Sequence, residues 1–398
     1  MYPDAEGRAR AGSGARWVAR LMVTDFRNFR LGEIECDERP LVLVGPNGAG
    51  KTNLLEAVSL LTPGRGLRRA RLSDLPRQGS SNAGGASLNG DGGWAVAARV
   101  MTAGGPRELG TGSDPAEEPG RSRRAVKVDG AFAASQQALG EVLAAVWLTP
   151  AMDRLFLEGP SARRRFLDRL VYGFEPAHAG RLSAYQSALR ERARLLKNGI
   201  ADGAWLNALE RSLAEKGVAI ADARRRTLER LAGACAQGIA GFPEAGLGLA
   251  GDAESRLETA SAVEVEEWMV RRLGESRALD AQTGGAAVGA QRADLAVTHL
   301  ARGMPAALCS TGEQKALLIS IVLAHARLLA VESGAAPLLL LDEVAAHLDG
   351  ERRARLFEEL CAIGAQAWLT GTEATLFDEL GSRAQRFVVR DAVVLREA

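Results

Sequence analysis

Residues 41–52 read Leu-Val-Leu-Val-Gly-Pro-Asn-Gly-Ala-Gly-Lys-Thr, an apolar run that leads into the pattern Gly-x-x-x-x-Gly-Lys-Thr. The helical sequence Asn-Leu-Leu-Glu-Ala-Val follows at residues 53–58. Glycines let successive backbone N–H groups turn toward one anion, and the N-terminus of the next helix adds a partial positive charge. A chance glycine-rich turn would need neither the strand before it nor the helix after it. The stretch therefore predicts a loop that binds the phosphates of a nucleoside triphosphate.

Two side chains of this loop have expected contacts. Lys51 is expected to reach the β- and γ-phosphates, and the hydroxyl of Thr52 is expected to ligate Mg²⁺. The predicted cofactors are therefore ATP and Mg²⁺.

A second informative pattern lies in the C-terminal third of the chain. Residues 337–341 form a continuous apolar run, as in a strand buried on both faces of a parallel sheet, and Asp342 and Glu343 follow it. This Walker B pattern predicts that Asp342 holds the Mg²⁺ shell and that Glu343 orients or deprotonates an attacking water. The alternative is a pair of solvated carboxylates at a strand end, which the phosphate loop in the same chain makes less favoured.

A third motif, Cys-Ser-Thr-Gly-Glu-Gln-Lys at residues 309–315, opens an apolar helix expected over residues 316–331. Ser310 and Glu313 fit a capping box, which alone would explain this spacing. Ser310 and the N–H of Gly312 also fit a second anion site, aimed at the γ-phosphate bound by another subunit. Both interpretations can hold together, and the order of motif, helix and Walker B strand favours the second.

Composition sets the frame for these motifs. A chain of 398 residues with 46% hydrophobic content predicts two or three domains with sizeable cores. Because 50 Lys and Arg balance 49 Asp and Glu, nucleic-acid binding would need local basic patches. We expect no membrane span, since no run of about 18 apolar residues and no signal-peptide core occurs.

The four cysteines are scattered without a Cys-x-x-Cys pair, which argues against zinc or disulfides and fits the cytoplasm. Cys309, at a helix N-terminus, could have thiolate character, but a small buried filler is the favoured role. The four histidines show no metal-ligand spacing and are expected to be packed or solvated.

The remaining segments suggest three regions. Residues 17–44 predict a strand, a turn and two more strands, and the glycine-rich stretches 79–93 and 104–120 are expected to be long hairpin loops. Residues 152–168 and 182–233 have the three- and four-residue apolar spacing of amphipathic helices. Glycines at 199, 203 and 217, and Pro243, are expected to interrupt this helical region too often for a long coiled coil.

Together these motifs resemble the heads of ATP-binding-cassette (ABC-type) ATPases, whose signature is close to Ser-Gly-Gly-Gln before a helix and the Walker B strand. Asp25–Phe29 after the first strand is similar to the DNA-repair branch that contains RecF, RecN and the structural-maintenance-of-chromosomes proteins. Within it, residues 64–68, 148–150, 159–168 and 310–315 are similar to the RecF family. The resemblance runs from about residue 21 to the C-terminus.

The resemblance implies an α/β fold, an ABC-type P-loop ATPase head with a mixed sheet flanked by helices and an inserted helical lobe. The expected divisions are a disordered extension (1–16), an N-terminal part of the head (17–146), the helical lobe (147–285) and a C-terminal part of the head (286–398). Glu343 and Lys51 would be catalytic, and Thr52 and Asp342 would bind the metal. The positions expected to contact nucleotide are Gly45, Asn47, Gly48, Ala49, Gly50, Lys51, Thr52, Arg27, Asn28, Ser310, Gly312 and Asp349.

Arg27 and Asn28 would lie near the base and sugar, and Asp349 at a dimer interface. The implied function is recombinational repair: an ATP-dependent homodimer that binds duplex DNA at gaps or junctions, loads recombinase with RecO- and RecR-like partners, and is released by slow, DNA-stimulated ATP hydrolysis. The implied location is the cytoplasm, without membrane.

Three departures from the ABC-type pattern matter. Residues 367–372 carry hydroxyls where transporter-type heads carry a switch histidine, which weakens the case for fast hydrolysis. No glutamine is evident near residues 145–147 for the expected interlobe position. Residues 289–295 retain Arg292 and Asp294 of a family motif but lack its histidine.

Two alternatives share the fold, namely a transporter ATPase subunit and a regulatory or nuclease-linked ATPase of the overcoming-lysogenisation type. The missing switch histidine disfavours the first, and the short C-terminal remainder disfavours the second. DNA binding would depend on basic clusters, each of which could instead be a solvated helix face. The clusters are Arg65 to Arg71, Arg121 to Lys127, Arg163 to Arg165, Arg190 to Lys197 and Arg224 to Arg226.

Overall fold

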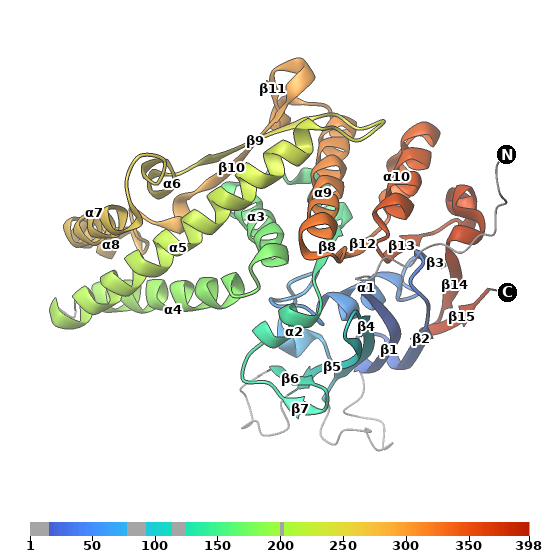
Figure 1. Cartoon of the computed structure of the whole chain (residues 1–398). Coiled ribbons are helices and arrows are strands. Elements are labelled where there is room, and N and C mark those ends of the chain that lie inside the picture. The colour runs from blue at the N-terminus through green and yellow to red at the C-terminus, as the bar shows by residue number, and fades with distance from the viewer. Residues whose placement is uncertain (1–15, 78–92, 114–123, 200–202, 398) are drawn as a thin grey trace.

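The computed structural model describes residues 16–77, 93–113, 124–199 and 203–397 (Figure 1). The extension expected at residues 1–16 lies almost wholly outside these ranges. So do most of the loop expected at 79–93 and the second half of the loop expected at 104–120.

A mixed six-stranded sheet carries the phosphate-loop strand. Its order is β15-β14-β3-β13-β12-β8, in which every neighbouring pair is parallel except β14 with β15. Parallel strands end at a common edge, so the ends of β3 and β12 meet although they are far apart in sequence. The strands are β3 (Leu41–Val44), β8 (Ala145–Leu148), β12 (Leu338–Leu341), β13 (Ala367–Gly371), β14 (Gln385–Arg390) and β15 (Val393–Arg396).

Strand β12 is buried on both faces, as its uninterrupted leucines predict. Leu338 and Leu340 pack in the core shared with β3 and the helix α1 (Lys51–Ser59). Leu339 and Leu341 pack in a second core on the opposite face. The Walker B strand is confirmed as a central strand of the sheet.

A second, antiparallel sheet has the order β2-β1-β4-β5-β6-β7 and shares the core of α1. Its strands are β1 (Trp17–Phe26), β2 (Phe29–Glu35), β4 (Ala95–Thr102), β5 (Gly105–Ser113), β6 (Arg124–Val128) and β7 (Ala131–Phe132). The prediction of a long loop from residue 104 is wrong over residues 105–113, which form β5. Glycine suits this strand because a Cβ at Gly112 would lie 2.5 Å from the Trp94 carbonyl oxygen.

Helices form an arm beside the sheets, and Figure 1 shows α4 and α5 side by side along it. The arm helices are α3 (Pro160–Phe174), α4 (His178–Lys197), α5 (Gly203–Ala236), α6 (Asp252–Arg256), α7 (Ala262–Glu275) and α8 (Arg277–Thr283).

Two expectations about these helices are wrong. Helix α3 begins at Pro160, not near residue 152, because Pro fits the first turn of a helix. Gly217 lies within α5 and does not interrupt it. A Cβ at this position would lie 2.6 Å from the Met269 methyl group of α7. The glycine instead lets α5 approach α7.

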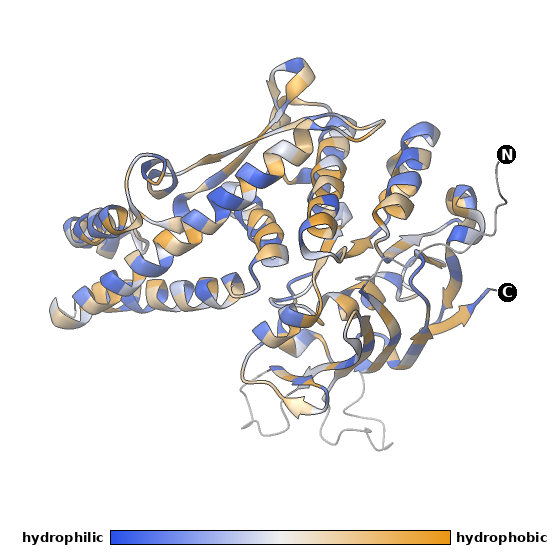
Figure 2. Cartoon of the chain, in the orientation of Figure 1, coloured by the Kyte–Doolittle hydropathy of each residue, from blue (hydrophilic) through white to orange (hydrophobic). Residues whose placement is uncertain are grey.

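A small antiparallel sheet, β9 (Ala245–Ala250), β10 (Asp294–His299) and β11 (Met304–Pro305), leads into α9 (Thr311–Ser333). By length and composition α9 could cross a membrane, but 67% of its most apolar window is buried inside the protein. Figure 2 shows it as predominantly hydrophobic beside the central strands. It is packed as a core helix.

Short elements complete the described chain. They are α2 (Gln137–Val142), α10 (Gly350–Ile363) and the 3₁₀ turns η1 (Leu72–Asp74), η2 (Pro150–Arg154), η3 (Ala290–Arg292), η4 (Leu300–Arg302), η5 (Ala306–Leu308), η6 (Val344–His347) and η7 (Ala374–Arg383).

Candidate functional site

The phosphate loop joins β3 to α1 and is fixed by close contacts at two glycines. A Cβ at Gly45 would lie 2.1 Å from the Val389 carbonyl oxygen on β14, and one at Gly50 would lie 2.7 Å from the Phe29 ring. Asn47 and Gly48 are exposed between these anchors, while Ala49 is buried. The loop thus presents its middle to solvent on a rigid base.

Lys51 lies inside this loop. Its Nζ donates to the carbonyl oxygens of Gly45, at 2.6 Å, and Pro46, at 3.0 Å. Burial lowers the pKa of the Lys51 ammonium, and the carboxylates of Glu343 and Asp342 oppose that shift. The ammonium is therefore placed between the loop and the Walker B carboxylates.

Thr52 and Asp342 meet across 290 positions of sequence. The Thr52 hydroxyl donates to the Asp342 carboxylate, with oxygen–oxygen distances of 2.9 and 3.2 Å. Hydroxyl and carboxylate oxygens are the ligands that Mg²⁺ prefers, and it also keeps waters and substrate phosphate oxygens. These two side chains fit the metal. The described residues contain no group of three or more His, Cys, Asp or Glu that could hold a metal alone.

Thr370, at the end of β13, links the two carboxylate residues. Its hydroxyl donates to Asp342 Oδ1 at 2.7 Å and accepts the Glu343 backbone N–H at 2.9 Å. Glu343 itself has a left-handed backbone, with φ of 51°, which is costly for a residue with a side chain. The sequence indicated only that hydroxyls replace a histidine in this region, and it missed this bridging role.

Arg27 and Asn28 support the loop from the turn between β1 and β2. Arg27 forms a bidentate ion pair with Glu56 of α1, with both nitrogen–oxygen distances at 2.8 Å. Asn28 donates to the Ala49 carbonyl oxygen at 3.1 Å and accepts from Asn53 at 2.7 Å. Their contact with the base and sugar stays a prediction.

The capping box at the start of α9 is confirmed. Ser310 accepts the Glu313 backbone N–H, and the Glu313 carboxylate accepts the Ser310 N–H at 3.0 Å. Ser310 and Gly312 are exposed. In Figure 1 the β9–β11 sheet, which leads into this end of α9, lies well away from β3 and α1. The motif is not brought to the phosphate loop of its own chain.

Two further sequence interpretations have structural outcomes. Asp349 is the N-cap of α10, where its carboxylate accepts the Arg352 N–H at 2.8 Å, and its role at a dimer interface stays a prediction. The thiolate interpretation of Cys309 is wrong, because the side chain is buried and burial raises the pKa of its thiol. Cys309 is the small core residue that the sequence favoured.

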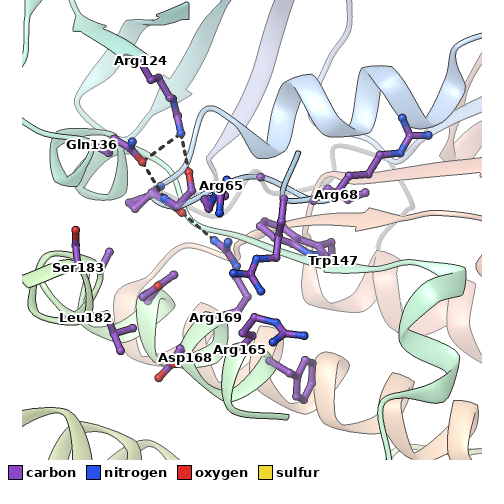
Figure 3. A pocket seen from close by; sticks show the side chains of 18 of the residues that line it. Arg65, Arg68, Arg124, Gln136, Trp147, Arg165, Asp168, Arg169, Leu182 and Ser183 are labelled. Atoms are coloured by element: carbon purple, nitrogen blue, oxygen red, sulfur yellow. Dashed lines mark hydrogen bonds between the residues drawn. The ribbon is translucent and has the colours of Figure 1, made fainter. Parts of the chain in front are cut away.

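A large cavity, about 1720 Å³, opens beside the Walker B edge. Thr52, Asp342 and Glu343 line one end of it, and Thr149 and Met152, which follow β8, line the neighbouring wall. The segment after β8, where the ABC-type pattern places the interlobe glutamine, therefore reaches the Walker B residues. No glutamine occurs between residues 145 and 154. Figure 3 shows the far end, where arginines from the loop after α1 and from α3 converge.

Several arginines of the basic clusters are internal ion-pair partners. Arg163 pairs with Asp294 at 2.8 Å, Arg224 with Asp168 at 2.8 Å, and the fully buried Arg192 with Glu210 at 2.9 Å. These three arginines pair with carboxylates inside the protein, so the alternative of a solvated helix face is wrong for them. Positions 121–123 of the second cluster lie outside the described residues.

Comparison with known proteins decides the family. The chain is 48% identical over 380 residues to the DNA replication and repair protein RecF of Mesorhizobium japonicum, covering 95% of this chain and 97% of the relative. It is 45% identical to RecF of Rhizobium leguminosarum bv. trifolii over 95% and 98% of the two chains. The chain belongs to the RecF family. No protein-family profile matches it.

Solved RecF structures share the fold over nearly the whole chain. The recombination mediator protein RecF with ATPrS, described in the RecFOR pathway, has a TM-score of 0.80 at 24% identity, covering 96% of this chain and 99% of that one. An Smc head domain from Pyrococcus furiosus has a TM-score of 0.53 at 16% identity, with 96% of each chain covered. The expected ABC-type ATPase head is confirmed. RecF membership also sets aside the transporter and lysogenisation-type alternatives.

Proposed function

We propose that this RecF-family chain is an ATP-gated DNA clamp of recombinational repair. One observation carries the proposal: the Thr370 hydroxyl donates to the Asp342 carboxylate and accepts the backbone N–H of Glu343. The Asp342 carboxylate also accepts from Thr52 of the phosphate loop, so the residues proposed to hold Mg²⁺ and to activate water lie together beside that loop. Its relatives are named DNA replication and repair proteins, which supports a role on DNA. Solved RecF chains with ATP and ATPrS support nucleotide binding.

Each residue of the site has a chemical task in this proposal. Lys51 and the N–H groups of the loop bind the phosphates, while Thr52 and Asp342 hold Mg²⁺. The metal, when bound, neutralises charge on the phosphate oxygens. Glu343 accepts a proton from the attacking water. The hydrolysis we propose is slow, because no histidine stands at the end of β13, and it is stimulated by DNA.

The nucleotide would be closed by a second copy of the chain. Ser310 and Gly312 are exposed at a helix N-terminus, an arrangement that favours an anion, and their own phosphate loop lies elsewhere in the molecule. We infer that they contact the partner's γ-phosphate and that Asp349 lies at the same interface. ATP then stabilises the dimer by mass action, and hydrolysis removes the γ-phosphate contacts.

The dimer would grip duplex DNA at single-strand gaps or junctions without reading sequence. Its partners would be RecO- and RecR-like proteins, and its task the loading of recombinase in the cytoplasm. The RecFOR pathway named for the solved RecF structures supports this assignment.

The test compares two serines that cap helices in the same way. Ser310→Arg should abolish ATP-dependent dimerisation, because the new side chain blocks the partner's phosphate. Ser261→Arg is the matched control, since Ser261 and Glu264 form the same capping box on α7. Sedimentation with saturating ATP and Mg²⁺ measures both variants. If Ser310→Arg dimerised like Ser261→Arg, the shared-nucleotide proposal would be wrong.

A further inference from the structure

Four arginines of the cavity lack a carboxylate partner among the described residues. Arg65 and Arg69 belong to the loop after α1, and Arg165 and Arg169 belong to α3. Neighbouring arginines differ in this respect: Arg68 contacts Asn53 and Glu56, and Arg163 pairs with Asp294. We call Arg65, Arg69, Arg165 and Arg169 the arginine group.

The charges of the arginine group repel one another. Burial lowers the pKa of Arg69, and the positive charges of Arg165 and Arg65 lower it further. Burial also lowers the pKa of Arg169 to about 10, with the charge of Arg69 acting in the same direction. With a pKa of about 10, Arg169 keeps its charge at neutral pH, and an anion that enters the cavity would offset the repulsion.

The surrounding structure holds the Arg169 side chain and the backbone of the loop that carries Arg65 and Arg69. The Arg169 guanidinium lies 3.7 Å from the centre of the Trp147 ring, and it donates to the Pro63 carbonyl oxygen at 3.2 Å. Arg124 fixes the preceding turn by donating to the Gly64 carbonyl oxygen at 2.7 Å. Arg69 has a left-handed backbone with φ of 54°, a costly conformation often found at functional sites. Arg169 and the loop backbone are therefore positioned before any ligand binds, while Arg65, Arg69 and Arg165 are exposed and can reach one.

No carboxylate of the cavity forms an ion pair with the group among the described residues, although the charge of Asp168 partly offsets the lowered pKa of Arg169. Asp168 is turned to Arg224 and His178, and Asp342 is turned to Thr52 and Thr370. Glu158 is exposed, and Glu343 lies at the Walker B end. Figure 3 shows Arg65, Arg165 and Arg169 directed into one part of the cavity, whereas Arg68 points away along α1.

The size of the cavity indicates which anion it suits. Pockets for small ligands are usually about 300–1,000 Å³, whereas this one has about 1720 Å³ and so leaves room beyond the nucleotide proposed at its Walker B end. Several guanidinium groups spread over a loop and a helix match successive phosphates of a polyanion better than one triphosphate. Contacts to backbone phosphates carry no base information, so this binding would be independent of sequence.

We propose that Arg65, Arg69 and Arg165 bind backbone phosphates of DNA, with Arg169 supporting them, in the same cavity that the Walker B carboxylates line. This assignment rests on the proposed DNA clamp and names the basic cluster that makes its contacts. It places bound DNA next to Glu343.

The experiment uses the full chain with ATP, Mg²⁺ and a gapped duplex, titrated over a series of salt concentrations. Arg65→Gln/Arg165→Gln removes one charge from each wall of the cavity. It should weaken binding about tenfold or more and reduce the salt slope of log K by about 2, roughly one per lost phosphate contact. Arg211→Gln/Arg271→Gln is the matched control, because both arginines are exposed on α5 and α7 outside the cavity. Its affinity and slope should stay unchanged.

Three results would count against these ideas in different ways. A wild-type chain that fails to bind DNA overturns the proposed clamp itself. A wild-type chain that binds DNA, together with an Arg65→Gln/Arg165→Gln variant of equal affinity and slope, overturns only the assignment of the arginine group. Parallel sedimentation with ATP separates the phosphate sources, since loss of ATP-dependent dimerisation in that variant would assign the arginines to nucleotide and overturn the DNA assignment.

Discussion

One hydroxyl fixes both carboxylate residues at the end of β12. Thr370 donates to Asp342, which is 7% exposed, and accepts from the backbone of Glu343. Loss of a hydrogen bond to a buried carboxylate destabilises the folded protein by about 1–3 kcal/mol. Substitution of a residue that orients a metal ligand commonly lowers metal affinity or activity by about 10–100-fold. Thr370 is thus a positioning residue for the proposed metal site.

Thr370→Val should therefore raise the Mg²⁺ concentration needed for half-maximal ATP turnover by about tenfold or more, because Asp342 loses the hydroxyl that orients it from β13 and keeps only its contact with Thr52. Thr370→Ser keeps the hydroxyl and should stay close to wild type. Steady-state ATP hydrolysis over a Mg²⁺ titration measures both variants. Equal Mg²⁺ dependence for the valine and serine variants would remove Thr370 from this role.

Sequence reasoning identified the residues whose chemistry demands fixed spacing. Lys51, Thr52 and Asp342 follow from the phosphate-loop and Walker B patterns, and the structure brings them together. Thr370 could not be assigned in this way, because its role depends on β13 pairing between β3 and β12. The missing partners of the arginine group likewise depend on contacts between distant segments.

At the scale of elements, local glycine patterns gave the wrong boundaries where tertiary packing decides. Gly112 lies inside β5, where the close Trp94 carbonyl leaves no room for a side chain. Gly217 lies inside α5, where the Met269 methyl group leaves no room for one. Both glycines read as loop or helix-breaking signals in sequence. Long periodic segments and the apolar strands were predicted correctly, because their burial pattern repeats over many residues.

The contact between α9 and α3 contains a buried histidine. His325 Nε2 donates to the Leu170 carbonyl oxygen at 2.8 Å, and its ring meets Phe174 edge to face at 5.1 Å. Nδ1 has no hydrogen-bond partner in the described chain. Burial lowers the pKa of His325 from its usual value near 6.5 to about 4, so the folded protein holds a neutral imidazole.

This histidine predicts a pH dependence of stability. Between pH 6.5 and about 4 the unfolded chain binds a proton at His325 that the folded chain does not, so the free energy of unfolding falls as pH is lowered. The contribution is up to roughly 3 kcal/mol, and it is fully retained above pH 6.5. His325→Gln keeps a donor for Leu170 and should lack this decrease. Denaturant unfolding at pH 7 and pH 5 tests the difference, and parallel curves for both proteins would contradict it.

At the scale of the whole molecule, the chain carries the two halves of the proposed nucleotide site in different places. The phosphate loop and the Walker B edge lie together, while Ser310 caps α9. The β9–β11 sheet, which leads into α9, lies well away from β3 and α1 (Figure 1). An ion pair at 3.4 Å between Lys315 of α9 and Asp153 of η2 connects the serine motif to the segment that enters the cavity. This ion pair thus links the cavity wall beside the Walker B residues to the surface proposed for dimerisation.

Glu343→Gln tests this arrangement in the assembled state. The substitution preserves the backbone N–H that Thr370 accepts and the size of the side chain, but the amide cannot take a proton from water. ATP and Mg²⁺ should therefore hold the variant as a persistent dimer, while wild type returns to monomer as ATP is consumed. Sedimentation after a single addition of ATP distinguishes the two, and chelation of Mg²⁺ before that addition should prevent dimer formation in both. A Glu343→Gln dimer that decays as fast as the wild-type dimer would mean that this carboxylate does not drive release.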